Sequence, residues 1–364
     1  MSNIYDIAQE VGVSAATVSY VLNGKAEQMR ISDATQKRVH KAARDLGYVP
    51  NVAAKKLILS KGAAVPEIAL LWSPVQHYFF LNIFTQTLQN MVSNGEVRGM
   101  QFKIIPFQHG ELQKQSEILL ENYCNGLIVP PNTKDDIDFL ESININVPII
   151  ILNEKAFKFS VVSVDNYHCG AMAAELFHQR GHRHVAVVQH FFGEIHQTLY
   201  NLTVSDRAVG FLDVCKNLGI DASLQFAGRI IPHSPDLNVG KQAVDEMIQK
   251  GSLPTAIFAL NDMLAIGISQ ALISYGVRIP EDVELVTFGH DFIPEINVPS
   301  ITSFAHPLET ISWESIRLMD QMLESPESAP KRILVDTPIT YRQSCPETIN
   351  EVMSKRLAQG LAVD

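Results

Sequence analysis

The stretch VSAATVSYVLNG, from Val13 to Gly24, decides how the beginning of the chain folds. Ser14 is a good N-cap, and Gly24 is a good residue to end a helix, so a helix of about ten residues is predicted between them. On a repeat of ~3.6 residues, the apolar side chains share one face and the small, uncharged polar side chains share the other. The inner face holds Ala15, Val18, Val21 and Leu22, and the outer face holds Ala16, Ser19, Tyr20 and Asn23.

Two further short helices are predicted on either side of this stretch. Before it, Ile4, Ile7, Ala8 and Val11 follow the spacing of a helix that packs one face, and Gly12-Val13 joins this helix to the next. Two short helices joined by a tight glycine turn are typical of a helix-turn-helix. After it, Ser32 is predicted to cap a third helix, whose inner face holds Val39, Ala42, Ala43 and Leu46. Three such helices can close one small core.

A helix with a small polar outer face fits the major groove of DNA, so the second helix is predicted to be a recognition helix. An ordinary three-helix module that binds protein, or nothing, is the alternative on spacing alone. The side chains expected near base edges are Ala15, Ala16, Thr17, Ser19 and Tyr20. Those expected closer to phosphates are Tyr5, Ser14, Asn23, Arg30 and Ser32.

The runs IYDIAQEVGVSAATVSYVLNG and RISDATQKRVHKAARDLGYVPNVAAKKL, between Ile4 and Leu57, resemble the DNA-binding headpiece of the lactose/galactose-repressor family of bacterial transcription regulators. The resemblance implies a hinge after the third helix that becomes helical on operator DNA and inserts a leucine into the minor groove. The hinge residues that it implies contact DNA are Tyr48, Asn51, Ala54 and Leu57, with Leu57 as the wedge. A plain flexible linker is the alternative for this segment, which is too short to be a stable helix alone.

The charge is unevenly distributed, although the whole chain of 364 residues has a net charge of -10. Residues 1–64 contain nine Lys and Arg against five Asp and Glu, a net charge of +4. The remainder contains 20 against 34, a net charge of -14. A basic headpiece on an acidic body suits a module that meets phosphate while the body is repelled from it.

Apolar runs alternate with amphipathic stretches after Glu67, which is typical of parallel sheets with helices on both faces. The predicted strands are 68–72, 102–107, 126–129, 148–152, 185–188, 256–260 and 283–288. They are too many for one sheet, so the predicted fold class is an all-α helix-turn-helix headpiece followed by an α/β core of two doubly wound parallel-sheet lobes. The resemblance implies a core shaped like a periplasmic sugar-binding protein, with three crossings between the lobes.

The predicted domains are a headpiece (1–48), a hinge segment (49–65), a two-lobed effector-binding and dimerisation core (66–345) and a tail (346–364). Lobe 1 is expected to hold about 66–164 and 292–325, and lobe 2 about 165–291 and 326–345. The tail has helical spacing and is either a further oligomerisation helix or a frayed surface helix.

Ligands of such folds bind where the strands end, and several side chains are expected there. Phe79 and Phe80 match a position where the family places a ring against the ligand, and Arg207 matches its pocket arginine, whose fork can hold two oxygens. Asn261 follows a strand and offers a donor and an acceptor, Asp262 is expected to cap the next helix, and Asp165 is a weaker candidate at the lobe crossover. The alternatives are a core role for the rings and a surface ion pair for Arg207.

Two positions depart from the family pattern. The family's usual GFDD sequence, whose first aspartate binds ligand hydroxyls, is TFGHD here, with Gly289 at that position, so the clamp is missing or displaced to His290 or Asp291. The usual TVSR of the recognition helix is TVSY, so Tyr20 replaces an arginine that can make a two-point contact to guanine. The first change disfavours a plain sugar effector, and the second predicts a different operator preference.

No other chemistry is indicated. Cys124, Cys169, Cys215 and Cys345 form no C-x-x-C, and the histidine-rich run from His178 to His196 resembles an ordinary family turn, so no metal and no cofactor are expected. No catalytic motif, membrane span or secretory leader is recognised, which disfavours an enzyme and predicts a cytoplasmic location.

The sequence therefore predicts a homodimeric, effector-controlled transcription regulator, most simply a repressor, that binds a pseudo-palindromic operator. Its expected partners are double-stranded operator DNA, a second copy of the chain and a small effector: a sugar, a nucleoside or base, or a small acid. A solute-binding protein without a DNA role is the main alternative, and an enzyme is the second.

Overall fold

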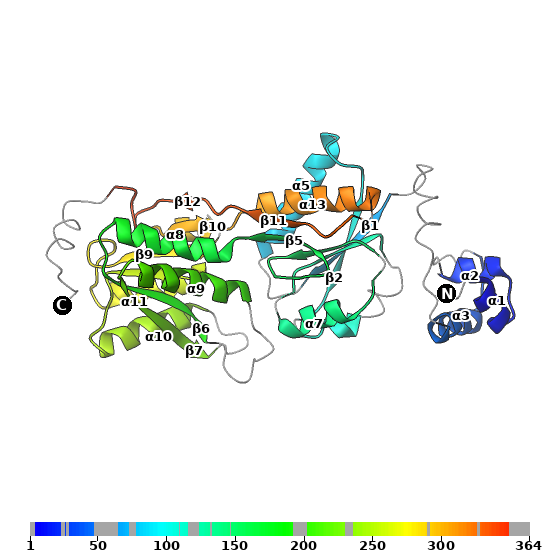
Figure 1. Ribbon diagram of the computed structural model, residues 1–364, viewed down its shortest axis with the longest axis horizontal. Helices are drawn as coiled ribbons and strands as arrows, with labels where there is room; N and C mark the ends of the chain where they lie inside the picture. The colour runs from blue at the N-terminus through cyan, green and yellow to red at the C-terminus, as the bar shows by residue number, and fades with distance from the viewer. Residues whose placement is uncertain are drawn as a thin grey trace.

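The computed structural model describes a small helical unit and two α/β lobes (Figure 1). The described residues are 4–22, 26, 29–46, 65–72, 78–108, 110–115, 124–131, 133–145, 147–191, 202–229, 236–289, 292–325 and 328–348.

The headpiece consists of helices α1 (Ile4–Val11), α2 (Ala15–Leu22) and α3 (Asp33–Asp45), which close one core. Ile7, Val18 and Val39, one from each helix, are completely buried in it. The three predicted helices are confirmed, and α2 has eight residues instead of about ten. Leu46 was expected in this core, but α3 ends one residue before it and its side chain is 39% exposed.

The first sheet is entirely parallel and has the strand order β11-β5-β4-β3-β1-β2. Helices α5 and α13 pack on one face, and η1 and α7 pack on the other, as Figure 1 shows for the three α-helices. The strands are β1 (Glu67–Trp72), β2 (Gln101–Pro106), β3 (Gly126–Val129), β4 (Ile149–Leu152), β5 (Ser160–Val164) and β11 (Arg332–Val335). The helices are α5 (Tyr78–Ser93), η1 (Leu112–Gln115), α7 (Lys134–Ser142) and α13 (Leu308–Glu324).

The second sheet has the order β12-β10-β9-β8-β6-β7 and is parallel except for the short strand β12. Helices α8 and α9 cover one face, and α10 and α11 cover the other. The strands are β6 (His184–Phe191), β7 (Asp221–Arg229), β8 (Ala256–Ala259), β9 (Glu284–Gly289), β10 (Thr302–Ala305) and β12 (Ile339–Thr340). The helices are α8 (Asn166–Gln179), α9 (Leu202–Asn217), α10 (Asp236–Gln249), α11 (Asp262–Ser274) and the short α12 (Phe292–Ile296).

Burial on both faces explains why the central strands are continuous apolar runs instead of alternating ones. Along β1, Ile68 and Leu70 pack toward α5 and α13, whereas Ala69 and Leu71 pack toward α7. The same division holds along β6. Each lobe is therefore a three-layer sandwich, as the fold class predicted.

The chain passes between the sheets three times: at Asp165, at 306–307 and at 336–338. The number of crossings confirms the prediction, but two of the predicted lobe boundaries are wrong. Strand β10 pairs with β9 in the second sheet, so 292–305 belongs to lobe 2 and the return to lobe 1 comes after Ala305. Strand β11 pairs with β5 in the first sheet, so 328–335 belongs to lobe 1. Backbone pairing decides these assignments, and no pattern in the sequence shows it.

Glycines allow two pairs of helices to approach closely in lobe 2. A Cβ atom on Gly170 of α8 would lie 2.0 Å from the carbonyl oxygen of Arg207 on α9, and one on Gly210 would lie 2.1 Å from that of Tyr167. Gly240 and Gly267 relate α10 and α11 in the same way. The backbones are thus in direct contact, and the position of α9 depends on that of α8.

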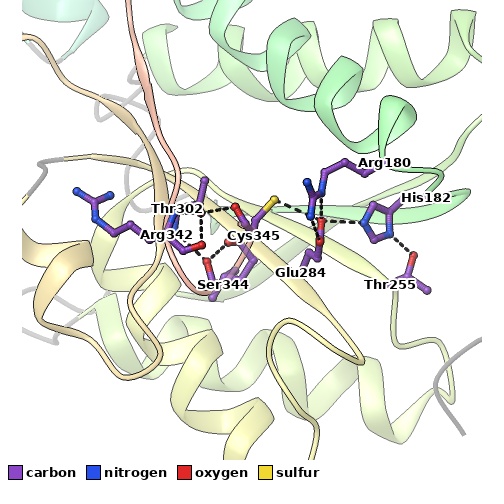
Figure 2. Close-up of polar contacts among 9 residues, drawn as sticks. Arg180, His182, Thr255, Glu284, Thr302, Arg342, Ser344 and Cys345 are labelled. Carbon is purple, nitrogen blue, oxygen red and sulfur yellow. Dashed lines mark hydrogen bonds and ion pairs between the residues drawn. The ribbon is translucent and has the colours of Figure 1, made fainter. Parts of the chain in front are cut away.

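A buried polar network closes the other end of the second sheet, where the strands begin (Figure 2). Glu284, the first residue of β9, accepts two hydrogen bonds from Arg180, one of them 2.6 Å long to Nε, and it lies 3.0 Å from Nε2 of His182. The thiol of Cys345 also donates to Glu284, at 3.3 Å, and Nδ1 of His182 lies 2.8 Å from the hydroxyl of Thr255. The network connects the segment around Cys345 to the end of the second sheet where its strands begin.

Candidate functional site

The outer face of α2 is available for contact with DNA. Ser14 caps the helix, because its hydroxyl accepts the amide hydrogen of Thr17 at 3.1 Å. Val18 and Val21 point into the core, as predicted, and Ala16 is exposed on the opposite face. The other predicted base-contacting residues, Ala15, Thr17, Ser19 and Tyr20, are half-buried. The helix therefore presents a short, uncharged surface without any long side chain except that of Tyr20.

Three further predicted phosphate contacts lie on α1 or just before α3. Tyr5 on α1 is 74% exposed, and Arg30 is exposed with a left-handed backbone (φ 54°) just before α3. Ser32 is exposed, and its hydroxyl accepts the amide hydrogen of Thr35 at 3.4 Å, so its hydroxyl also begins a helix. Arg38 donates to the carbonyl of Val11 and thereby fixes α3 against the end of α1.

Several predicted site residues lie outside the described residues. In the headpiece and hinge these are Asn23, Tyr48, Asn51, Ala54 and Leu57, and in the core they are His290 and Asp291. Their roles stay predictions.

In lobe 1, the two predicted aromatic residues lie in the first turn of α5, near the end of β1. The ring of Phe80 is 7% exposed and stacks on that of Trp72, with centroids 5.8 Å apart and planes 5° from parallel. Phe80 also packs on Phe84 in the lobe core. The structure describes the backbone of Phe79 but not its side chain. Phe80 thus has the core role that the sequence left open, and its stacking partner Trp72 is a half-buried residue at the end of β1.

In lobe 2, Arg207 on α9 is 6% exposed and lies close to the ends of the central strands. Its Nη1 donates to the carbonyl oxygen of Leu260 at 2.8 Å, and its guanidinium carbon lies 3.9 Å from the centre of the Phe288 ring. Burial lowers the pKa of Arg207 to about 10, and the charge of Asp262 acts in the opposite direction. The guanidinium is therefore protonated at neutral pH. It is not a surface ion pair.

The helix cap predicted at Asp262 is instead formed by its neighbour Asn261. Asn261 is the N-cap of α11, because its Oδ1 accepts the amide hydrogen of Leu264 at 2.9 Å. Asp262 is the first residue of the helix, is 5% exposed and lies near Arg207 and Gly289. The expectation that Asp262 would be the cap was wrong, since the helix begins one residue earlier than predicted.

Asp165 lies at the first crossing between the lobes and is the N-cap of α8, accepting the amide hydrogen of His168 at 2.9 Å. One turn along, the buried thiol of Cys169 lies within reach of the charges of Asp165 and Arg207 and is hydrogen-bonded by Thr337, on the third crossing. Burial raises the pKa of Cys169 to about 11, so the thiol is neutral.

The second crossing lies next to the same group of side chains. The ring of His306 meets that of Phe288 edge-on, with centroids 5.4 Å apart, and its amide donates to the carbonyl of Gly289 at 2.7 Å. Arg207 thus touches a ring that in turn touches a crossing between the lobes. Phe288 was predicted as part of a strand but not as a partner of Arg207.

Gln189 is a further residue that the sequence analysis missed. It lies near the end of β6, is 8% exposed, and its Oε1 has no hydrogen-bond partner within the described part of the chain. The signal was present in the sequence, because a single polar residue ends the otherwise apolar run VAVV.

Within the residues that the structure describes, no three His, Cys, Asp or Glu side chains gather as they would around a metal ion. No helix in that part of the chain has the length and apolar character needed to cross a membrane.

A helix-turn-helix headpiece attached to a body of two parallel-sheet lobes, linked by three crossings, defines a DNA-binding regulator with a ligand-binding core. Residues 3–51 match the family model described as bacterial regulatory proteins, lacI family, and residues 174–345 match a periplasmic binding protein-like domain. The chain is a transcription regulator whose headpiece matches the lacI family of bacterial regulatory proteins.

The similarity to known proteins extends over nearly the whole chain. The HTH-type transcriptional regulator DegA of Bacillus subtilis (strain 168) is 26% identical over 352 residues, which cover 94% of this chain and 98% of DegA. A complex of the transcriptional regulator CelR with cellobiose superposes with a TM-score of 0.64 at 23% identity, covering 94% of this chain and 100% of that one. The lac repressor dimer bound to operator and an anti-inducer gives a TM-score of 0.64 at 19% identity, covering 95% and 99%.

Proposed function

We propose that the chain acts inside the cell as a homodimer that represses metabolic genes by binding a pseudo-palindromic operator, and that a small effector controls this binding. Each headpiece places α2 in the major groove of one half-site, with the exposed face of Ala16 toward the bases. Support for the dimer and the operator comes from the lac repressor, which has the same fold and is a dimer on operator in its solved structure.

The effector site that we propose lies at the ends of the lobe 2 strands, around Arg207. The single observation that supports it best is that Arg207 is a buried guanidinium, and its Nε has no hydrogen-bond partner within the described residues. A buried donor without a partner costs about 1–3 kcal/mol, so a ligand that accepts its hydrogen is expected to bind there. Asn261 and Asp165, which both cap helices, are proposed to shape this site, and CelR in complex with cellobiose has the same fold.

The same side chains suggest how the effector controls DNA binding. Arg207 contacts Phe288, which packs on His306 at the second crossing, and Arg207 lies near Cys169, which is hydrogen-bonded to Thr337 at the third. A ligand on Arg207 would change the relative stability of two lobe arrangements. Paired hinge segments at the dimer centre, each with Leu57, would then be brought together or separated. The sign of the effect depends on which arrangement binds the effector more tightly.

DNA binding is tested by selecting fragments from a random duplex library with the full-length protein, with and without a panel of sugars, nucleosides and small acids. We expect one enriched, pseudo-palindromic sequence whose recovery changes with one class of effector. Fluorescence anisotropy at two salt concentrations should show steep salt dependence, because phosphate contacts release counterions. A protein that prefers no duplex over bulk competitor with any effector would contradict the proposed function.

A further inference from the structure

The carboxylate of Asp262 lies where a side chain of Gly289 would be, at the end of the second sheet. Gly289 is the last residue of β9, and Asp262 begins α11 after the neighbouring strand β8. A Cβ atom on Gly289 would lie 1.8 Å from Oδ1 and 2.2 Å from Oδ2 of Asp262, closer than any real contact. The carboxylate therefore lies directly against the backbone of β9. Any side chain at position 289 would force it to move.

The positive charge near the carboxylate of Asp262 is that of Arg207. Both side chains are almost fully buried, with 5% of Asp262 and 6% of Arg207 exposed, and the charge of Asp262 acts on the guanidinium. The two charges together sum to zero. An ionised ligand would therefore leave one buried charge uncompensated, whereas a neutral ligand would not.

Gln189 adds a second acceptor at the same edge. It lies near the end of β6, which pairs with β8, and its Oε1 has no hydrogen-bond partner among the described residues. Adjacent strands β6, β8 and β9 thus end near an amide oxygen, a carboxylate and a glycine, with a guanidinium from α9 close by. A ligand with several hydroxyl groups matches this set, because each hydroxyl can donate to a carboxylate or amide oxygen and accept from a guanidinium.

We propose that Asp262 is the side chain that selects the effector. Its carboxylate accepts hydrogen bonds from the hydroxyl groups of a neutral, polyhydroxylated ligand. Position 289 is a glycine because this carboxylate occupies the place of a side chain. The inference rests on the proposed function, since it concerns the same effector site. It narrows the effector to neutral molecules rather than small acids. It also reverses the expectation that the glycine at position 289 disfavours a plain sugar, because the carboxylate of Asp262 lies where that side chain would be.

The ligand class is tested by thermal denaturation of the full-length protein with matched pairs of ligands: D-glucose with D-glucuronate and D-galactose with D-galacturonate, together with D-ribose and cellobiose. We expect at least one neutral sugar to raise the midpoint and, where a matched acid exists, to raise it more than that acid does. A wild-type protein that no neutral sugar stabilises, or that an acid of a pair stabilises more, overturns the proposal.

The residue is tested with Asp262→Asn, which keeps the size of the side chain and removes its charge. The apparent Kd for the stabilising sugar should rise at least about tenfold, and the preference within the pair should shift toward the acid, because Arg207 is then uncompensated. Gly289→Ala keeps the carboxylate but displaces it, so it should cause a similar loss. Sugar binding that is unchanged in both variants overturns the proposal.

Two matched controls accompany these variants. Asp135→Asn removes an exposed aspartate from the first turn of another helix, α7, and Gly99→Ala adds a methyl group where no atom lies within 4 Å. Both should bind the sugar as the wild type does. Circular dichroism checks that each variant is folded, and if one of the two test variants is not, the other decides the result.

The failure of this inference can be distinguished from failure of the proposed function. If the wild type selects a duplex but Asp262→Asn and Gly289→Ala bind the sugar normally, only the role of Asp262 is wrong. If the wild type prefers no duplex, the proposed function is wrong, and the sugar titrations still decide what Asp262 does.

Discussion

The guanidinium of Arg207 lies over the ring of Phe288, with its central carbon 3.9 Å from the ring centre. This contact joins a buried cation on α9 to the end of β9, next to a crossing between the lobes. It stabilises the cation where few water molecules can do so. A ligand that binds Arg207 would therefore contact a guanidinium that packs, through Phe288, against the second crossing between the lobes.

Arg207→Lys should greatly reduce the effector response. Lysine keeps the positive charge but has no planar fork, so it can neither stack on Phe288 nor donate in two directions. We expect the apparent Kd for the effector to rise about tenfold or more, measured by thermal denaturation with the stabilising ligand. Arg317→Lys is a suitable control, because Arg317 also lies over a ring, that of Trp313, but on α13. An Arg207→Lys protein with normal effector affinity would remove Arg207 from the site.

Phe288→Leu should separate effector binding from control of DNA binding. Leucine fills part of the space but offers no ring face to Arg207 and no edge to His306. The effector should still bind, with a weaker influence on operator affinity, which is measured by anisotropy with and without a saturating effector. Coupling of wild-type strength in this variant would show that the path to the crossing does not pass through Phe288.

Glu284→Gln should destabilise the protein at neutral pH by about 3–5 kcal/mol, because it breaks a buried ion pair and leaves Arg180 uncompensated. Burial by itself would raise the pKa of Glu284, but the hydrogen bonds from His182 and Arg180 lower it overall. A lowered pKa stabilises the fold above the ordinary value of 4.5, and this contribution is lost as the pH falls through the lowered value.

The measurement is urea denaturation between pH 7 and pH 3 for the wild type, for Glu284→Gln and for the exposed control Glu309→Gln. The difference between the wild type and Glu284→Gln should shrink as the pH falls. A difference that is constant over this range would mean that the charge of Glu284 contributes nothing to stability.

Gly170→Ala should destabilise lobe 2 by about 1–3 kcal/mol or more, because the new methyl group would meet the carbonyl of Arg207 and force α8 and α9 apart. The same displacement moves Arg207, so effector affinity should fall as well. Thermal denaturation with and without the ligand measures both effects. Gly99→Ala, in open space, should change neither, and a Gly170→Ala protein of wild-type stability would mean that the helix pair adapts at no cost.

Leu57→Ala tests the hinge that the sequence predicts. We expect operator affinity to fall about tenfold or more and DNA bending to decrease, because an inserted apolar wedge kinks the duplex. Circular-permutation gel shifts measure the bend, and Leu59→Ala, in the same segment, is the control. A bend that the first substitution does not change would contradict a wedge role for Leu57.

Local patterns predicted the three headpiece helices and seven of the strands, whereas β5, β7 and β10 were not among the predicted strands. The caps at Ser14 and Ser32 and the buried faces of α1 and α2 could be read from spacing, and the doubly buried strands from their continuous apolar runs. Hydrogen bonds between distant strands could not be predicted, which is why β10 and β11 were assigned to the wrong lobes. Their pairing depends on sheet edges formed far away in the sequence.

The site was predicted only in part, for a similar reason. The motif predicts Arg207 as a pocket residue, whereas the position of the Asp262 carboxylate against Gly289 could not be predicted, since it depends on the absence of a side chain on a different strand. Phe80 and Trp72 illustrate the same limit. Two aromatic rings stacked on each other can belong to the core or face a ligand, and the sequence does not show what covers each ring.

The three crossings have a consequence for synthesis on the ribosome. The headpiece depends on contacts within its own short sequence, so it can fold as soon as it emerges. Neither lobe can do so, because β11 completes the first sheet and β12 the second, and both follow all the other strands in the chain. A nascent or prematurely terminated chain would therefore have a finished headpiece without the core that pairs two headpieces on an operator, so neither tight operator binding nor an effector response is expected of it.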